Sequence, residues 1–273
     1  MHLFCFGYGY VARFLSKKLL SLSWKVSGTS RNQDVHNTNF FNYDKVNKDT
    51  FQDVTHVLVS IPPDGDDALE RYGHYFQNTK WLGYLSAASV YGDHAGNWVK
   101  EESETKPIES RGKSRLRAEK KWLNSKLPVH IFRLTGIYGP GRNVLVDLQL
   151  NKARNVQKEG HFFSRIHVED ISNILFSSMQ NIKPGEIYNC ADDLPATQSE
   201  VVAYAAELLN VSVPEPVEIS SLPDHAQSFY LGSKKVSNIK VKRDLGISLV
   251  YPNYKVGLEN LISNQQAPIE RGE

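Results

Sequence analysis

Apolar runs and helical repeats alternate along the first part of the chain. The apolar run at residues 2–6 is followed by a pattern in which Val11, Phe14 and Leu19 recur at steps close to a helical turn. A short apolar run is typical of a buried strand, and the longer repeat predicts an amphipathic helix. Residues 25–29 then predict a second strand, at the distance that one strand–helix–strand unit requires.

The same alternation continues toward the C-terminus. Further strands are predicted at residues 40–44, 56–61, 81–86 and 129–134 and around Ile187, and helices at residues 66–77 and 201–209. Strands that alternate with helices favour a parallel sheet covered on both faces. The predicted fold class is therefore α/β, a doubly wound parallel sheet of about seven strands.

A glycine turn joins the first strand to the first helix. Gly7, Gly9 and Ala12 form the pattern G-x-G-x-x-A, directly after the strand and at the start of the helix. This pattern in this context indicates a Rossmann dinucleotide-binding turn, in which the backbone approaches a pyrophosphate at the helix N-terminus. Gly7, Gly9, Tyr10 and Val11 are therefore predicted cofactor contacts. The alternative is a tight turn without a ligand.

The end of the second strand bears on the choice between NADP and NAD. An acidic residue about 20 residues beyond the glycines is typical of NAD binding. The chain has Ser30 and Arg31 there, which favours NADP, because Arg forms forked hydrogen bonds to a phosphate. The alternative for Arg31 is a solvated loop side chain. Asp44 after the third strand either faces the adenine amino group or forms a turn.

Other strand ends are expected at the same sheet edge. Pro62 and Pro63 end the fourth strand at its carboxyl edge, where ligands of parallel sheets bind, so Ile61 and Pro62 are predicted cofactor contacts. Asp170 is predicted to cap a helix, and Asp192 reads as a turn residue. His167 is expected to be structural rather than catalytic, because a lone His more often has its hydrogen bonds satisfied in the interior than acts in chemistry.

The composition of the chain restricts the kinds of ligand and partner that it is expected to bind. The 273 residues include 32 Lys and Arg against 30 Asp and Glu, a net charge of +2. A balance this even argues against nucleic acid as a partner and favours a small molecule. No apolar run reaches the length of about 18 residues that a membrane helix needs. No metal-ligand spacing appears, so the expectation is a soluble cytoplasmic protein without membrane or metal.

Several segments resemble one known family. Residues 86–92 (SAASVYG) are similar to the S-S-x-x-V-Y-G segment of extended short-chain dehydrogenases/reductases, the epimerase and dehydratase branch that acts on nucleotide sugars. Residues 133–142 resemble its R-x-x-x-x-Y-G-P-G turn, residues 163–170 its F-I-H-V-x-D segment and residues 186–191 its last strand. The motifs follow in the family's order, and the resemblance runs from residue 3 to about residue 192.

The catalytic residues of that family are replaced. The resemblance implies a Tyr and a Lys four residues apart on a helix, with a Ser or Thr after the fifth strand. Alignment places Arg111 at the Tyr position, Arg115 at the Lys position and Ala87 at the hydroxyl position, while a shifted alignment offers Ser86 or Ser89. Arg remains protonated and cannot act as a base. The chain therefore resembles the atypical members that lack the Y-x-x-x-K pair.

Two interpretations of the arginines remain open. Arg111 and Arg115 share a helix face and either hold the cofactor or an anionic substrate by forked hydrogen bonds, or belong to a solvated basic face. The resemblance also implies that Thr135, Gly136 and Ile137 contact the nicotinamide.

The resemblance further implies a division of the chain and a function. A Rossmann domain of residues 1–142 with 166–192 would carry NADP or NAD, and a smaller α+β lobe of residues 143–165 with 193–273 would hold the substrate. The substrate is expected to be a small anionic molecule or a nucleotide sugar, and a homodimer is usual for the family. Two functions are carried forward. One is an NADP-linked oxidoreductase or sugar-nucleotide isomerase with altered catalytic groups. The other is a catalytically inactive NADP(H)-sensing or regulatory protein.

Overall fold

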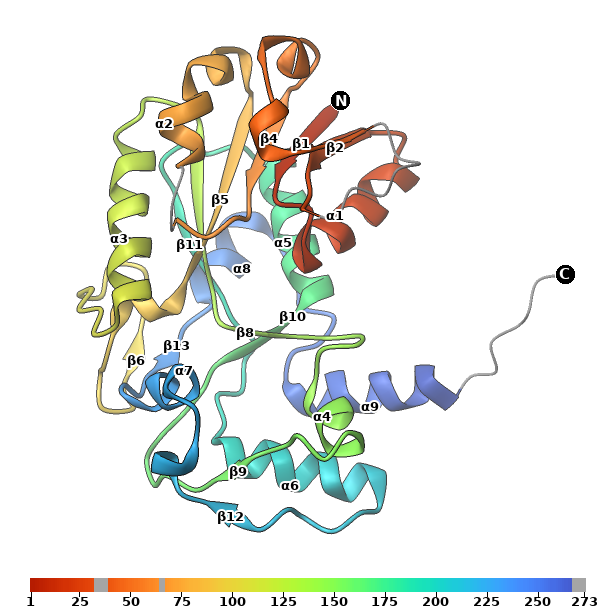
Figure 1. Ribbon diagram of the computed structural model, residues 1–273, viewed down its shortest axis with the longest axis vertical. Coiled ribbons are helices and arrows are strands. Elements are labelled where there is room, and N and C mark those ends of the chain that lie inside the picture. The colour runs from red at the N-terminus through yellow and green to blue at the C-terminus, as the bar shows by residue number, and fades with distance from the viewer. Residues whose placement is uncertain (32–38, 64–66, 267–273) are drawn as a thin grey trace, which may run out of the picture.

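Seven parallel strands form the central sheet of the computed structural model, which describes residues 1–31, 39–63 and 67–266 (Figure 1). Across the sheet the strands are β11 (Ile187–Cys190), β7 (Val129–Leu134), β5 (Trp81–Ala87), β4 (His56–Val59), β1 (His2–Phe6), β2 (Lys25–Thr29) and β3 (Phe40–Phe41). Successive strands of the chain are added on one side of β1 up to β3 and on its other side from β4 onward. In a doubly wound sheet the ligand binds in the crevice at this point, between β1 and β4. The predicted fold class is confirmed.

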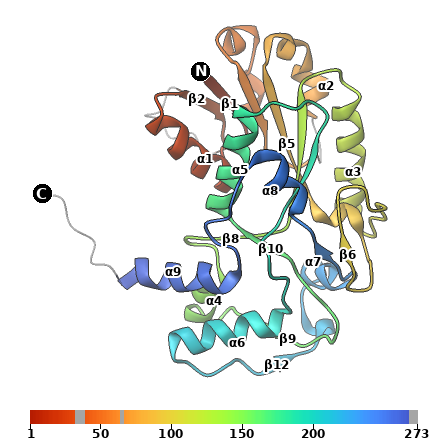
Figure 2. The same ribbon diagram turned by 180° about the vertical axis from the view of Figure 1, so that it is seen from behind.

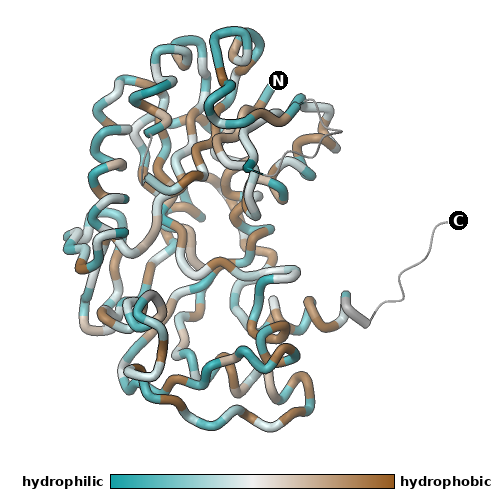
Figure 3. Tube along the Cα trace, in the orientation of Figure 1, coloured by the Kyte–Doolittle hydropathy of each residue, from teal (hydrophilic) through white to brown (hydrophobic). Residues whose placement is uncertain are grey.

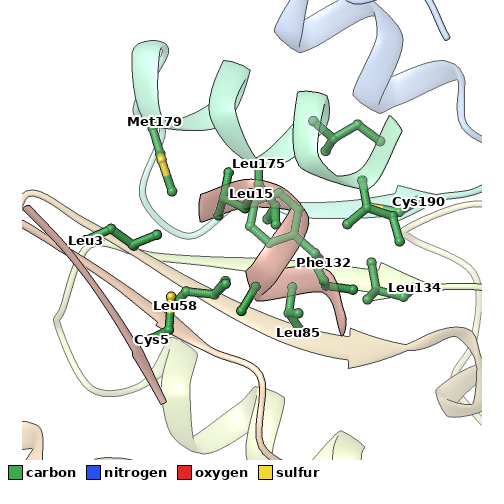
Figure 4. Packing of buried hydrophobic residues seen from close by; sticks show 14 of the residues in the cluster. Leu3, Cys5, Leu15, Leu58, Leu85, Phe132, Leu134, Leu175, Met179 and Cys190 are labelled. Atoms are coloured by element: carbon green, nitrogen blue, oxygen red, sulfur yellow. The ribbon is translucent and has the colours of Figure 1, made fainter. Parts of the chain in front are cut away.

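Alternate residues of each strand face opposite layers of helices. Leu3 and Cys5 of β1 pack in the cluster covered by α1 (Tyr10–Ser21), α5 (Val168–Gln180) and α8 (Ile239–Leu245), part of which is shown in Figure 4. Figure 2 shows α5 and α8 side by side on this face. Strands buried on both faces are typical of parallel sheets.

The second face of the sheet carries α2 (Ala68–Tyr72) and α3 (Ser110–Leu123). Phe4 and Phe6 of β1 point to this side, where Trp122 of α3 packs against Phe76 and Tyr84. Most residues of α3 are hydrophilic, whereas the central strands are largely hydrophobic (Figure 3), and the residues of α3 that pack on the sheet, such as Trp122, are buried. α3 is therefore amphipathic, and its inward face brings polar residues to the end of β5.

A smaller lobe lies beyond the carboxyl ends of the strands. It contains α4 (Val144–Gln149), α6 (Gln198–Leu209) and α9 (Tyr254–Gln266), with a two-stranded sheet of β9 (Asn155–Val156) and β12 (Pro216–Val217). Leu145, Val201 and Leu258 pack in its core. Parallel strands β8 (Gly136–Tyr138) and β10 (Arg165–His167) lie between the lobe and the sheet.

The remaining short elements connect the lobe to the end of β5. Strand β6 (Trp98–Val99) pairs with β13 (Lys235–Val236), and α7 (Asp224–Gln227) precedes that strand. Segment 193–273, which the sequence assigns to the lobe, also sends α8 back onto the sheet, where Val241 and Leu245 are buried. The division of the chain into two domains stays a prediction.

Two elements differ from their predicted extents. The helix expected at residues 66–77 is α-helical only from Ala68 to Tyr72 and continues as a 3₁₀ helix over Gly73–Asn78. Gly73 lies at this change, and Gly is among the weakest helix formers. The third strand ends at Phe41, because the Asn42 side chain accepts from the amide of Asp44 and starts a 3₁₀ turn.

Candidate cofactor and substrate site

The glycine turn is fixed by contacts with the two neighbouring strands. Gly7 has φ +87°, a conformation that favours glycine, and a Cβ there would lie 2.7 Å from Ile61 Cγ2. The Gly7 amide donates to Thr29 Oγ1 at 2.9 Å, and the Tyr8 amide donates to the Thr29 carbonyl at 2.7 Å. The end of β2 and the end of β4 thus hold the turn in one geometry.

The N-terminus of α1 is open to a ligand. Gly9 is the N-cap, no side chain caps the helix, and its first turn carries no acidic residue. A Cβ built at Gly9 meets no atom within 4 Å, so the space in front of it belongs to the cavity that Gly9 lines. Ala12 is fully buried against the sheet. This arrangement fits the pyrophosphate of a dinucleotide, because free helix amides and close backbone approach are what the anion needs.

A cavity of about 540 Å³ lies at the carboxyl ends of the strands, on the side that faces the lobe. It brings the glycine turn together with the end of β5, the first turns of α3 and lobe residues from 162 to 164 and 228 to 236. Of the predicted site residues, Gly9, Tyr10, Val11, Ser86, Ala87, Ser89, Arg111, Arg115, Thr135, Gly136 and Ile137 line it.

Other predicted cofactor residues lie outside the lining. Gly7, within the glycine turn, packs against Ile61, Pro62 lines a small separate hollow together with Ile61, and the Ser30 amide donates to the Phe41 carbonyl. Arg31 is exposed at the end of β2. Asp44 forms an ion pair with Arg71, with 2.7 Å between Oδ1 and Nη1. The roles of these residues toward a cofactor stay predictions.

Gly112 brings α3 close to the end of β5. A Cβ at this position would lie 2.9 Å from the Ser89 carbonyl oxygen, so only Gly allows this approach without a shift. Arg111 and Arg115 consequently reach the cavity. Pairing of β5 with β4 ends at Tyr84, and Arg115 donates to the carbonyl of the next residue, Leu85. Arg115 is thereby anchored at the strand end.

Ser86, Ala87 and Ser89, the residues that could align with the catalytic hydroxyl of the family, differ in their surroundings. Ser86 donates to Glu119 Oε1 at 2.5 Å, and Glu119 Oε2 lies 2.8 Å from Arg133 Nη2 in a buried ion pair. Ser86 lines the cavity, but its hydroxyl is already engaged by Glu119. Ala87 carries no hydroxyl, and Ser89 lines the cavity from a 3₁₀ helix at Ala88–Tyr91.

Among the described side chains that line the cavity, few can gain or lose a proton near neutral pH. Burial raises the pKa of Tyr10 to about 12, although the Arg142 charge partly opposes it, and its hydroxyl donates to the Pro140 carbonyl. Thr135 donates to the Cys190 carbonyl, and Ser164 accepts from the Val236 amide. The lining residues that the structure describes thus contain no Tyr and Lys pair of the family type.

Lys234 is a lining residue that sequence reasoning missed. Its Nζ donates to the Gly92 carbonyl at 2.8 Å, and burial lowers its pKa while the Asp93 and Glu109 charges oppose that shift. It sits in a segment without a motif or periodic pattern, so only the tertiary fold reveals it. The described lining also has three arginines, at 111, 115 and 142, against one carboxylate, Glu109. The cavity therefore favours an anion.

Residues near the cavity have mainly structural roles. His167, not Asp170, caps α5 by accepting from the Glu169 amide, and burial lowers the His167 pKa to about 4. The predicted cap at Asp170 is wrong. Its carboxylate instead accepts the amides of Val250 and Tyr251, which lie ahead of α9.

Asp192 combines a turn with burial. Its Oδ1 accepts from the Leu194 amide, as the turn prediction requires, yet the residue is only 1% exposed and Oδ2 has no hydrogen-bond partner. Burial raises its pKa to about 8, and the Arg165 charge only partly offsets this.

The seven-strand parallel sheet, with a glycine turn after its first strand, is the fold of solved NAD-dependent epimerase/dehydratase proteins, the extended short-chain dehydrogenases/reductases, which are this chain's structural neighbours. The predicted resemblance is confirmed. Among solved structures, a functionally unknown conserved protein from Silicibacter pomeroyi is 41% identical over 96% of this chain and 98% of its own, with a TM-score of 0.91. The chain belongs to one family with that protein.

Other matches are more distant. Protein YeeZ of Escherichia coli K12 is 24% identical over 90% of this chain and 95% of its own length. Human epimerase family protein SDR39U1, solved with NADPH, is 14% identical over 97% of this chain and 100% of its own, with a TM-score of 0.76. MoeE5, solved with UDP-glucuronic acid and NAD, is 18% identical over 96% and 97%, with a TM-score of 0.77. No family model matches the chain.

Metal and membrane features are absent from the described part of the chain. No group of three or more His, Cys, Asp and Glu side chains gathers there in a way that would hold a metal ion. No helix within it has the length and apolar character needed to cross a bilayer.

Proposed function

We propose that this chain is an NADP-linked oxidoreductase or sugar-nucleotide isomerase of the epimerase/dehydratase type, with altered catalytic groups. The observation that carries the proposal is one continuous cavity that joins the open N-terminus of α1 to a cationic pocket under the lobe. A cofactor and an anionic substrate would meet in it. The bound cofactor would supply hydride exchange at its nicotinamide ring.

The chain's own residues would position the two ligands. The amides of the first turn of α1 would bind the pyrophosphate, and Arg142, whose guanidinium lies 5.8 Å from the Tyr10 ring centroid, stands beside them with a permanent charge. Thr135, Gly136 and Ile137 would hold the nicotinamide end. Arg111 and Lys234, which both line the cavity, would bind the anionic groups of the substrate.

The preference for NADP rests on the end of β2. Thr29 is occupied by the glycine turn, and Ser30 and Arg31 follow it without an acidic residue at these positions. An acid there would repel a 2′-phosphate, whereas Arg31 attracts it. NADPH in the structure of human SDR39U1 and NAD in that of MoeE5 support nicotinamide dinucleotides as the ligand class.

A second function is favoured by the altered catalytic positions. Arg111 cannot take up a proton, Arg115 is anchored to Leu85, and Ser86 is bound to Glu119. A protein with these three side chains at the catalytic positions would bind NADP(H) without turnover. It would sense the NADPH/NADP ratio, or regulate a partner protein according to which form of the cofactor is bound.

Titration with NADPH and NADH, followed by nicotinamide fluorescence, tests the shared premise. We expect NADPH to bind more tightly than NADH, and absence of binding by both would eliminate both functions. Absorbance at the nicotinamide band with a panel of nucleotide sugars and aldehydes then separates them. Turnover with any substrate identifies an enzyme, and binding without turnover across the panel identifies a sensor.

A further inference from the structure

The wall that the lobe contributes to the cavity is mostly apolar. Its described apolar lining residues are Phe162, Phe163, Phe229, Leu231 and Val236, and Ile108 continues this surface from the segment before α3. Phe229 and Leu231 are 56% and 55% exposed, so much of their apolar surface is in contact with water. A ligand that covered them would remove that apolar surface from water, which is favourable.

Lys234 is held as the cationic end of this wall. The backbone of Gly232 packs closely on Gly92 and Asp93, which follow the 3₁₀ helix at Ala88–Tyr91, and a Cβ at Gly232 would lie 3.0 Å from the Gly92 carbonyl oxygen. The Ser233 amide donates to Asp93 Oδ1 at 2.8 Å. These contacts fix the chain just before Lys234, and the Lys235 amide donates to the Asn97 carbonyl at 3.0 Å just after it. The Lys234 ammonium donates to the Gly92 carbonyl while lining the cavity. A fixed, half-buried ammonium is a binding group for one carboxylate or phosphate oxygen.

The wall that the lobe contributes offers few hydrogen-bond partners to a hydroxyl-rich ligand. No Asn, Gln, Asp or His side chain occurs among the described residues that line the cavity. Ser164 is engaged by the Val236 amide, and Ser228 also has an interaction of its own. Sugar hydroxyls that lose water need protein hydrogen bonds in exchange, and each one left unpaired is costly. The wall is therefore suited to a body without hydroxyls.

We propose that the lobe side of the cavity binds a small anion with an apolar body, its carboxylate or phosphate on Lys234 and its apolar part on Phe229 and Leu231. This inference rests on the proposed function, because it names the substrate class of the same cavity. Within that function it selects the oxidoreductase with an apolar acid or phosphate as substrate over the sugar-nucleotide isomerase.

Calorimetric titration of the full chain, with and without NADPH, tests the inference. The probes are 4-phenylbutyrate, its neutral amide 4-phenylbutyramide, and glucuronate, which has the charge but carries hydroxyls. We expect 4-phenylbutyrate to bind about tenfold more tightly than either of the others. Equal or tighter binding of glucuronate, or no binding of 4-phenylbutyrate, would overturn the inference. Since NADPH binding is measured separately, failure here is distinct from failure of the proposed function.

Matched variants locate the probe. Lys234→Met is expected to weaken 4-phenylbutyrate binding about tenfold and to leave binding of the amide unchanged. Phe229→Ser should weaken binding of both the acid and the amide about fivefold or more, because each has the apolar body. The controls are Lys17→Met, an exposed lysine of α1, and Leu20→Ser, which is 56% exposed like Phe229. Retained NADPH binding shows that a variant is folded, and unchanged 4-phenylbutyrate affinity in both cavity variants contradicts the proposal.

Discussion

Arg133 Nη2 lies 2.8 Å from Glu119 Oε2, and both side chains are almost wholly buried beneath the cavity floor. Arg133 also donates to the Tyr91 hydroxyl at 2.9 Å and to the Glu101 carbonyl at 3.1 Å. The pair therefore links α3, β7 and the segment after β5. Each charge has the other as its counterion, and Ser86 also donates to Glu119, so the floor of the site depends on both residues of the pair.

Glu119→Gln should destabilise the fold strongly. The substitution leaves the Arg133 charge buried without its counterion, which typically costs about 3–5 kcal/mol of the free energy of unfolding. Urea unfolding followed by circular dichroism measures the change. Lys121→Met on the same helix is the control, since it removes an exposed pair with Glu70 and should have little effect. Equal effects of the two substitutions would contradict this account of the floor.

The two glycines of the turn should respond differently to alanine. Gly7→Ala is expected to lower the free energy of unfolding by about 1–3 kcal/mol, because φ is +87° and Ile61 leaves no room. Gly9→Ala should change stability by less than about 0.5 kcal/mol and still weaken NADPH about tenfold, since its methyl group enters the ligand space. Urea unfolding and fluorescence titration of both variants check this. Unaltered NADPH affinity in Gly9→Ala would place the cofactor elsewhere.

Restoring the family's catalytic residues tests the alignment. Ala87, Arg111 and Arg115 all line the cavity, so Ala87→Ser, Arg111→Tyr and Arg115→Lys together should create or raise nicotinamide-linked turnover. General acid–base groups typically contribute roughly 10²–10⁴-fold. Absorbance at the nicotinamide band with the same substrate panel is the measurement. A triple variant that binds NADPH but stays inactive on every substrate would count against the alignment.

Lys234 should make anion binding dependent on pH. Only the protonated ammonium attracts the anion, so affinity for 4-phenylbutyrate should fall as pH rises through the pKa of Lys234. Burial lowers that pKa, and the fall should therefore begin below the ordinary lysine value of about 10.4. Calorimetry from pH 6 to pH 10 measures it. Lys234→Arg should remove the fall, because Arg keeps its charge, and a profile shared by both proteins would assign the effect to another group.

Asp192 should make stability decrease with pH. Its pKa is about 8 in the folded chain, above the value of about 3.9 expected when the chain is unfolded. The folded state therefore binds an extra proton between these values, and the free energy of unfolding falls as pH rises through this window and is level beyond it. Asp192→Asn should remove about 2 kcal/mol or more of the loss between pH 5 and pH 8. Urea midpoints at both pH values provide the test, and parallel pH slopes would contradict it.

Sequence patterns within a single segment are sufficient to predict the helices and strands where the pattern is regular. The run at residues 2–6, the glycines at 7 and 9 and the periodicity that follows predict β1, the turn and α1, because burial on both sheet faces leaves a continuous apolar strand. The same signals gave too long a helix at residues 66–77. Packing of Leu69 beside Gly73, where a Cβ would come within 3.0 Å, accompanies the tighter 3₁₀ geometry there.

The cavity was only partly accessible from the sequence. Arg111 and Arg115 were found because α3 has an aligned motif, whereas Lys234 is 142 positions from the carbonyl that it contacts and has no local pattern. The burial of Asp192 depends on the lobe packing around it, which the turn signal does not report. The position of Lys234 and the burial of Asp192 depend on contacts between segments that are far apart in the sequence. A single sequence does not show such contacts directly.

The cavity takes one wall from the central sheet and the other from residues 162–164 and 228–236 of the lobe. A ligand that touches both walls must stabilise the closed arrangement over any state in which residues 228–236 detach, by an amount that grows with ligand concentration. Amide hydrogen exchange in that segment should therefore slow in proportion to occupancy. Its exchange rate would report saturation even for a ligand that undergoes no reaction.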